Sequence, residues 1–167
     1  MRFIGSKERL LDFIEFVLED NNINDGLFFD IFSGTGVVGK RFKEKGFDII
    51  SNDNMFFSYI LQYVSIELSE YPDFSNLPID DLNLDSNDPE NVIDYLNSLD
   101  GSKDFFYENY SPAGDKDRMY FTKKNAAKID AVRMTIEKWR NYNYINQNEY
   151  YFLINSLVEA IPYVSNI

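Results

Sequence analysis

Two glycines and two aspartates in the first third of the chain are the residues best suited to binding a ligand. Gly34 and Gly36 follow the apolar run 27–32, and glycines let a backbone approach a ligand where a Cβ atom would clash. Asp30 lies within that run, and Asp53 follows about twenty residues later, where its carboxylate can accept hydrogen bonds from both hydroxyls of a ribose. The spacing predicts a nucleoside-containing ligand across the ends of two strands.

The elements that would position these residues form a β-α-β unit. The nearly continuous apolar run 27–32 is typical of a strand buried on both faces of a parallel sheet. A helix is predicted over 37–45, ended by Gly46, and a second strand over 47–53. Two strands joined in this way should be parallel, with a right-handed crossover.

Helices are predicted for most of the remaining chain. Ser6 can cap a helix beginning at Lys7, with Leu10, Ile14, Val17 and Leu18 as its apolar stripe. The stretch 55–68 is apolar almost all round, which indicates a buried helix. The stretch 71–90 should be irregular, and 101–114 should form an aromatic loop. Three further helices are expected at 89–99, 122–140 and 148–161. With only two credible strands, the sheet looks incomplete as given.

Composition excludes several chemistries. The chain has no cysteine and no histidine, which excludes disulfides, thiolate or histidine metal sites and Ser-His-Asp catalysis. We therefore expect no metal site.

The sequence shows neither a leader peptide nor a membrane span, so we expect a cytoplasmic protein. The net charge of −12 argues against nucleic acid, but cations gather in one segment, which is either a DNA-binding segment or a solvated helix face. They are Lys103, Lys116, Arg118, Lys123, Lys124, Lys128, Arg133, Lys138 and Arg140.

The glycine turn by itself leaves three interpretations open. Gly39 follows Gly36 at the spacing of a G-x-G-x-x-G string, which would indicate an NAD-dependent oxidoreductase. The turn can also be a plain β-α connection without a ligand. A non-enzyme that keeps a degenerate cofactor fold is the third interpretation.

A family resemblance favours a different cofactor. The string 30–36 resembles the Asp-x-Phe-x-Gly-x-Gly motif of DNA amino-methyltransferases. The string 2–7 resembles the Lys-Tyr-x-Gly-Ser-Lys motif of Dam-like adenine-specific DNA methyltransferases, and Asp53 matches their acidic second-strand end. The segments 106–112, 118–122, 129–133 and 159–166 also look like this family, so the resemblance covers nearly the whole chain.

The resemblance implies an α/β fold, the N-terminal part of a class I S-adenosylmethionine-dependent methyltransferase (Rossmann-like) domain, followed by a mostly helical region. Residues 1–70 would bind S-adenosylmethionine, and residues 71–167 would contact DNA. Lys7 would meet the methionine carboxylate, Asp53 the ribose, and the residues from Asn54 to Phe56 the adenine ring. The implied cofactor-binding residues are Phe3, Ile4, Gly5, Ser6, Lys7, Asp30, Phe32, Ser33, Gly34, Thr35, Gly36, Asp53, Asn54 and Met55.

The implied activity is transfer of a methyl group from S-adenosylmethionine to the N6 amino group of adenine in double-stranded DNA, within a restriction-modification system. The implied DNA-binding residues are Lys116, Arg118, Lys123, Lys124 and Lys128.

The family's catalytic Asp/Asn/Ser-Pro-Pro-aromatic loop is missing. Asp88-Pro89 and Ser111-Pro112 each lack the second proline and the aromatic residue, so no catalytic residue is assigned. The catalytic loop is expected beyond residue 167. We therefore expect this chain to be inactive alone, and to self-associate or bind a second chain that completes its sheet.

Overall fold

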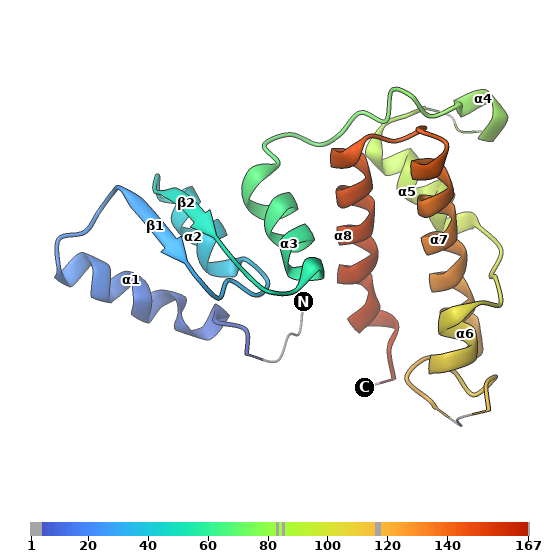
Figure 1. The fold of residues 1–167 in the computed structure, drawn as a ribbon, viewed down its shortest axis with the longest axis horizontal. Coiled ribbons are helices and arrows are strands. Elements are labelled where there is room, and N and C mark those ends of the chain that lie inside the picture. The colour runs from blue at the N-terminus through green and yellow to red at the C-terminus, as the bar shows by residue number, and fades with distance from the viewer. Residues whose placement is uncertain (1–4, 83, 85, 116–117, 167) are drawn as a thin grey trace. The chain divides into compact units, whose positions relative to one another are not determined.

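The computed structural model describes residues 5–82, 84, 86–115 and 118–166. The predicted site residues Phe3, Ile4 and Lys116 lie outside these described residues. The chain divides into two compact units, Met1–Glu70 and Tyr71–Ile167 (Figure 1).

The first unit contains the predicted β-α-β arrangement. Strands β1 (Leu27–Asp30) and β2 (Asp48–Ser51) pair in parallel, with Phe28 opposite Ile49, and helix α2 (Val37–Glu44) connects them (Figure 1). The predicted parallel pairing is confirmed, although each strand is shorter than the apolar run that predicted it. The carboxyl ends of both strands therefore meet at one edge of the sheet.

One face of this sheet carries the core of the unit. Phe28 stacks on Phe42 of α2 with ring centroids 4.6 Å apart, and Phe47 packs edge-on against Phe42. Helix α1 (Leu11–Asp20) covers the same cluster, and its Glu15 pairs with Arg41 at 2.9 Å and with Lys45. Burying these rings supplies much of the stability that holds the strand ends in place.

The other face of the sheet is exposed. Leu27, Phe29 and Ile50 alternate with the covered residues and are 66%, 56% and 48% exposed. The expectation of a strand buried on both faces is therefore wrong, because the packing recorded for α1 and α2 lies on the Phe28 and Ile49 face. Apolar surface of this kind favours association with further polypeptide.

The helix predicted from Lys7 begins later. A short 3₁₀ turn, η1 (Glu8–Leu10), precedes α1, although the Glu8 N–H does donate to the Ser6 hydroxyl at 3.3 Å. Because of this turn, the packed stripe is shifted: Ile14 and Leu18 contact the core as predicted, but Leu10 and Val17 are exposed.

The apolar stretch 55–68 forms two joined segments. Helix α3 (Phe56–Gln62) runs into a π-helix, η2 (Tyr63–Glu67). Ile60, Leu61 and Ile66 are buried as expected, but Phe56 and Tyr59 are 63% and 43% exposed. The helix is thus buried on one side rather than all round. Segments of π-helix are rare and often lie at functional sites.

Among the described residues of the second unit, the regular secondary structure is helical, apart from one isolated bridge between Phe121 and Ser165. Its helices are α4 (Ile79–Leu82), α5 (Pro89–Ser98), α6 (Phe105–Tyr110), α7 (Lys123–Asn141) and α8 (Gln147–Val164) (Figure 1). Helix α7 packs against α5, α6 and α8. Within the described ranges, no helix is long and apolar enough to cross a membrane.

Helix α7 follows its prediction closely. The Thr122 hydroxyl accepts the Asn125 N–H at 3.1 Å and caps the helix, as expected. All of the apolar face predicted for this helix is buried: Ile129, Val132, Ile136 and Trp139.

Two predictions for the second unit are wrong. The aromatic loop contains helix α6, because the buried Asp130 carboxylate of α7 accepts the N–H groups of Phe106 at 3.0 Å and Tyr107 at 2.8 Å. A cap supplied from a distant helix leaves no local signal. Helix α8 also continues past Pro162 to Val164, because the φ of proline is compatible with a helix, although its ring removes one N–H donor and crowds the carbonyl four residues earlier.

Glu149 gives the second unit a pH-dependent stability. Its side chain is fully buried in a capping box with Asn146, and burial, with the charge of Asp73 adding to it, raises the pKa of Glu149. The folded state therefore holds this proton more tightly than the unfolded chain, so its stabilising effect is present at low pH and is lost as pH rises through the folded pKa.

We expect the unfolding free energy to fall as pH rises above the ordinary pKa of a glutamate, because a chain without histidine has few other groups that titrate toward neutral pH. Glu149→Gln should reduce this fall, and the exposed Glu159→Gln on the same helix should not. Urea unfolding across the pH range measures both. An unchanged pH dependence in Glu149→Gln would contradict the assignment.

Candidate functional site

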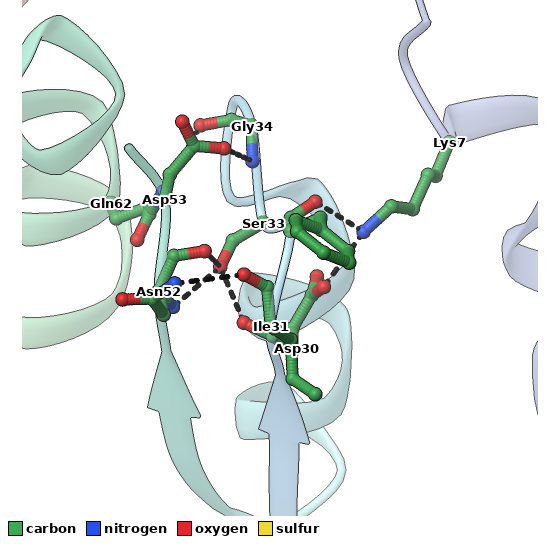
Figure 2. Close-up of polar contacts among 9 residues, drawn as sticks. Lys7, Asp30, Ile31, Ser33, Gly34, Asn52, Asp53 and Gln62 are labelled. Carbon is green, nitrogen blue, oxygen red and sulfur yellow. Dashed lines mark hydrogen bonds and ion pairs between the residues drawn. The ribbon is translucent and has the colours of Figure 1, made fainter. Parts of the chain in front are cut away.

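The carboxyl end of β1 holds a charged pair. Asp30 ends the strand and is 7% exposed, and the Lys7 ammonium donates to its Oδ1 at 2.7 Å and to the Phe32 carbonyl at 2.7 Å (Figure 2). The second carboxylate oxygen of Asp30 is buried and has no hydrogen-bond partner among the residues that the structure describes. A buried carboxylate oxygen without a donor is costly, so this atom is ready to accept a hydrogen bond from a ligand.

The glycine turn follows directly. Gly34 and Gly36 have φ angles of +55° and +78°, a left-handed backbone that glycine adopts without strain. A Cβ atom at Gly36 would lie 3.0 Å from the Ser65 hydroxyl and 3.2 Å from Cγ of Gln62. Both the conformation and the space around the turn therefore require glycine at Gly36.

Ser33 ties the two strand ends together. Its hydroxyl lies 2.8 Å from the Asp30 carbonyl and 2.9 Å from both the N–H and the carbonyl of Asn52 (Figure 2). The Ser33 N–H also donates to the Asn52 carbonyl at 2.9 Å. The turn after β1 is thus fixed to the residue that follows β2.

Asp53 holds the turn from the β2 side. One carboxylate oxygen accepts the Gly34 N–H at 2.8 Å (Figure 2). The other accepts the Met55 N–H at 3.0 Å. These hydrogen bonds, from Met55 first and then Gly34, lower the pKa of Asp53, so the side chain is charged at neutral pH. The carboxylate is partly exposed, so it can still bind the hydroxyls of a ribose.

Unpaired backbone donors border the turn. Gly36 is the N-cap of α2, and within the described chain the N–H groups of Thr35, Val37 and Val38 have no hydrogen-bond partner. A helix N-terminus carries partial positive charge. Together with Lys7, these donors make the edge of the sheet suited to a ligand that carries a carboxylate and several hydroxyls.

The residues after Asp53 provide apolar surface. Met55 and Phe56 are 54% and 63% exposed, and the Phe56 ring stacks on Tyr59 with centroids 6.0 Å apart. An exposed aromatic and a polarizable thioether beside a ribose site suit stacking against a base.

Most of the predicted cofactor residues therefore lie at one edge of the sheet. The structure brings together the members that contact one another there, which are Lys7, Asp30, Phe32, Ser33, Gly34, Asp53 and Met55. Thr35 and Gly36 belong to the same turn, Asn54 follows Asp53, and Gly5 and Ser6 precede Lys7 in sequence.

Gln62 also contacts the glycine turn, and it was not predicted from the sequence. Its side-chain amide donates to the Gly34 carbonyl at 3.2 Å, across 28 residues, and it is 5% exposed. The available signal was a polar residue within the apolar stretch 55–68.

The predicted DNA-binding cations differ in whether their side chains already contact other residues of the chain. Lys123 and Lys124 are exposed at the start of α7, and neither has a partner within the described part of the chain. Arg118 lies over the Tyr110 ring at 5.7 Å. The Lys128 ammonium donates to the carbonyls of Asn97, at 3.0 Å, and Leu99, and so caps the end of α5.

The two single-proline sequences have local structural roles. Asp88 caps α5 by accepting the N–H groups of Glu90 at 3.0 Å and Asn91 at 3.2 Å. The Ser111 hydroxyl is buried and donates to the Tyr107 carbonyl at 2.6 Å. These contacts account for the polar residue before each proline.

A parallel β-α-β unit with an acidic second-strand end is the arrangement of nucleotide-binding α/β proteins. The chain belongs to the D12 class N6 adenine-specific DNA methyltransferase family, whose model matches residues 3–167. The resemblance identified from the motifs is thereby confirmed.

Curated relatives agree with the family model. The chain is 43% identical over 168 residues to the type II methyltransferase M.FokI of Planomicrobium okeanokoites, covering 100% of this chain and 25% of the relative. It is 36% identical to the modification methylase StsI of Streptococcus sanguinis, covering 99% and 24%. It is 33% identical to the type II methyltransferase M.NlaIII of Neisseria lactamica, covering 99% and 46%. The chain thus spans a quarter to just under half of these relatives. No solved structure matches it.

Proposed function

We propose that residues 1–70 bind S-adenosylmethionine at the carboxyl ends of β1 and β2, as part of an adenine-specific DNA methyltransferase of a restriction-modification system. The observation that carries this proposal is Asp53, which holds Gly34 at 2.8 Å while its charged carboxylate remains partly exposed beside the turn. Membership of the D12 family supports the choice of cofactor and of duplex DNA as the substrate.

The residues present fit this cofactor. Within the described residues Asp30 offers a buried oxygen without a donor, and Gly36 lets the turn adopt a left-handed backbone packed closely against Ser65 and Gln62. S-adenosylmethionine, when bound, supplies the methyl group. Lys7 would hold its carboxylate by charge, Asp53 its ribose, and Met55 would flank its adenine ring.

We further propose the class I, Rossmann-like fold for the complete domain, with the described sheet as its first two strands. Residues 71–167 would contact DNA, because the cations of the chain gather between 103 and 140 although the net charge is −12. Within this region Lys123 and Lys124 are the freest candidates for phosphate contacts.

The glycine spacing alone also fits an NAD site. A Cβ atom at Gly39 would lie 2.6 Å from Cδ1 of Ile66 and 3.2 Å from Cγ2 of Ile49, so this glycine serves close packing of α2, as the third glycine of a dinucleotide site does. Calorimetric titration of the chain with S-adenosylhomocysteine and with NAD⁺ separates the two functions. We expect heat of binding with the first ligand only, and binding of NAD⁺ alone would refute the proposal.

The DNA contact has its own test. DNA affinity should fall with salt, and the slope of log K against log salt concentration measures this dependence. Changing Lys123 and Lys124 together to alanine should make that slope shallower by about one to two units, because each lost phosphate contact reduces it by about 0.9. Fluorescence anisotropy with a labelled duplex at several salt concentrations measures this slope.

The matched control is Lys40→Ala together with Lys43→Ala, two lysines of α2 in the first unit. This pair should leave the slope unchanged. Equal slopes for the wild-type chain and the Lys123/Lys124 variant would show that these two lysines are merely solvated.

A further inference from the structure

We propose that Gln62 is a positioning residue for the cofactor turn, an inference that rests on the proposed binding of S-adenosylmethionine. Gln62 lies at the last position of α3 and is buried. Its amide nitrogen donates to the Gly34 carbonyl at 3.2 Å, on the side of the turn opposite to Lys7 in the view of Figure 2. A buried amide that uses its donor on a single backbone carbonyl fixes the orientation of that peptide.

The peptide that Gln62 holds joins Gly34 to Thr35. The described chain has no cis peptide bond, so the carbonyl and the N–H of this unit point in opposite directions. With the carbonyl directed toward Gln62, the Thr35 N–H points away from α3. That N–H has no partner within the described residues, and Thr35 is partly exposed. Gln62 thus presents the Thr35 N–H as a free donor on the side where the cofactor would bind.

The turn is held on both sides by two different residues. Asp53 accepts the N–H of Gly34 at 2.8 Å, and Gln62 donates to its carbonyl. Gly34 has a φ of +55°, a conformation with several accessible alternatives for glycine. Without Gln62, the peptide unit between Gly34 and Thr35 could rotate so that its carbonyl faces water. The Thr35 N–H would then no longer be held in one orientation. The expected result is weaker cofactor binding rather than a loss of the fold.

Two variants of Gln62 test this role. Gln62→Met keeps the length of the side chain and removes the donor, so affinity for S-adenosylhomocysteine should fall about 3- to 10-fold, the range for one neutral hydrogen bond. Gln62→Glu should lose at least as much at neutral pH, where a carboxylate would face a carbonyl oxygen. Burial and the facing carbonyl oxygen should raise the pKa of this new carboxyl above its ordinary value, so at about pH 5 the protonated acid can donate again and affinity should recover toward that of the wild-type chain.

The matched control is Ser65→Ala. The Ser65 hydroxyl of η2 also lies beside the turn, but it donates to the Leu61 carbonyl of the preceding helix α3 at 2.7 Å. This variant should bind as the wild-type chain does. Calorimetric dissociation constants at both pH values, with the unfolding temperature of each ligand-free variant, are the readouts. The pH-dependent recovery is a signature that a purely structural role would not produce.

Two results would overturn the role of Gln62. One is Gln62→Met binding within twofold of the wild-type chain, and the other is Gln62→Glu showing no recovery of affinity relative to wild type at about pH 5. Failure of the wild-type chain itself to bind S-adenosylhomocysteine would instead refute the proposed function, and the role of Gln62 with it.

Discussion

Replacing Asp53 by alanine should weaken binding of S-adenosylmethionine by about 10- to 150-fold, or about 1.5–3 kcal/mol, the range for losing hydrogen bonds to a charged acceptor. The change removes the proposed ribose acceptor. It also frees the N–H groups of Gly34 and Met55, which the carboxylate holds at 2.8 Å and 3.0 Å. Both effects act at the same edge of the sheet, which is why the expected loss exceeds that of Gln62→Met.

Calorimetry on the purified chain measures the loss, and Asp48→Ala is the matched control. Asp48 is exposed at the other end of β2, away from the glycine turn, so its replacement should leave the affinity unchanged. If Asp53→Ala bound the cofactor as tightly as Asp48→Ala, the ribose assignment would be wrong.

The second large effect concerns catalysis. Residues 1–167 alone should transfer no methyl group to duplex DNA. Methyl transfer needs the target amino nitrogen held in line with the methyl group, and acceptors placed for the charge that develops on it. In the family this is the work of the Pro-Pro-aromatic loop, whereas the five prolines of this chain all occur singly. The polar residues before Pro89 and Pro112 are occupied in capping α5 and in bonding the Tyr107 carbonyl.

A tritium-transfer assay on mixed-sequence duplex DNA tests this expectation, with an active adenine methyltransferase of the same family as the positive control. Label in the DNA above the level without protein would mean that the active site has been misplaced. In that case Asp88→Ala and Ser111→Ala would identify which single-proline sequence is catalytic.

The sequence was a good guide where local patterns decide the structure. The parallel pair β1 and β2 followed from two apolar runs around a glycine turn, and the capped helix α7 followed from Thr122 and a periodic apolar face. Asp53 and Gly34 also lie at the ends of neighbouring strands, where motif spacing placed both residues, although the hydrogen bond between them was not predicted. These features depend on residues close in sequence or on one repeated geometry.

Features that depend on distant partners escaped prediction. Helix α6 exists because Asp130, more than twenty residues away, caps it, and the contact of Gln62 with Gly34 spans 28 residues. The exposure of Phe29 and Ile50 could not be predicted either. An apolar run indicates that both faces of a strand suit burial, but it does not show which segment covers each face. For the same reason, the sequence did not show that Lys128 caps α5.

Amide mapping by nuclear magnetic resonance tests the central claim most directly, namely that the cofactor lies at the carboxyl ends of β1 and β2. Titration of the ¹⁵N-labelled chain with S-adenosylhomocysteine should shift the amide signals of Gly34, Thr35, Val37 and Met55 most, since these surround the proposed site. The α7 and α8 amides should move little. Shifts concentrated in residues 71–167, or no shifts at saturating ligand, would contradict the account.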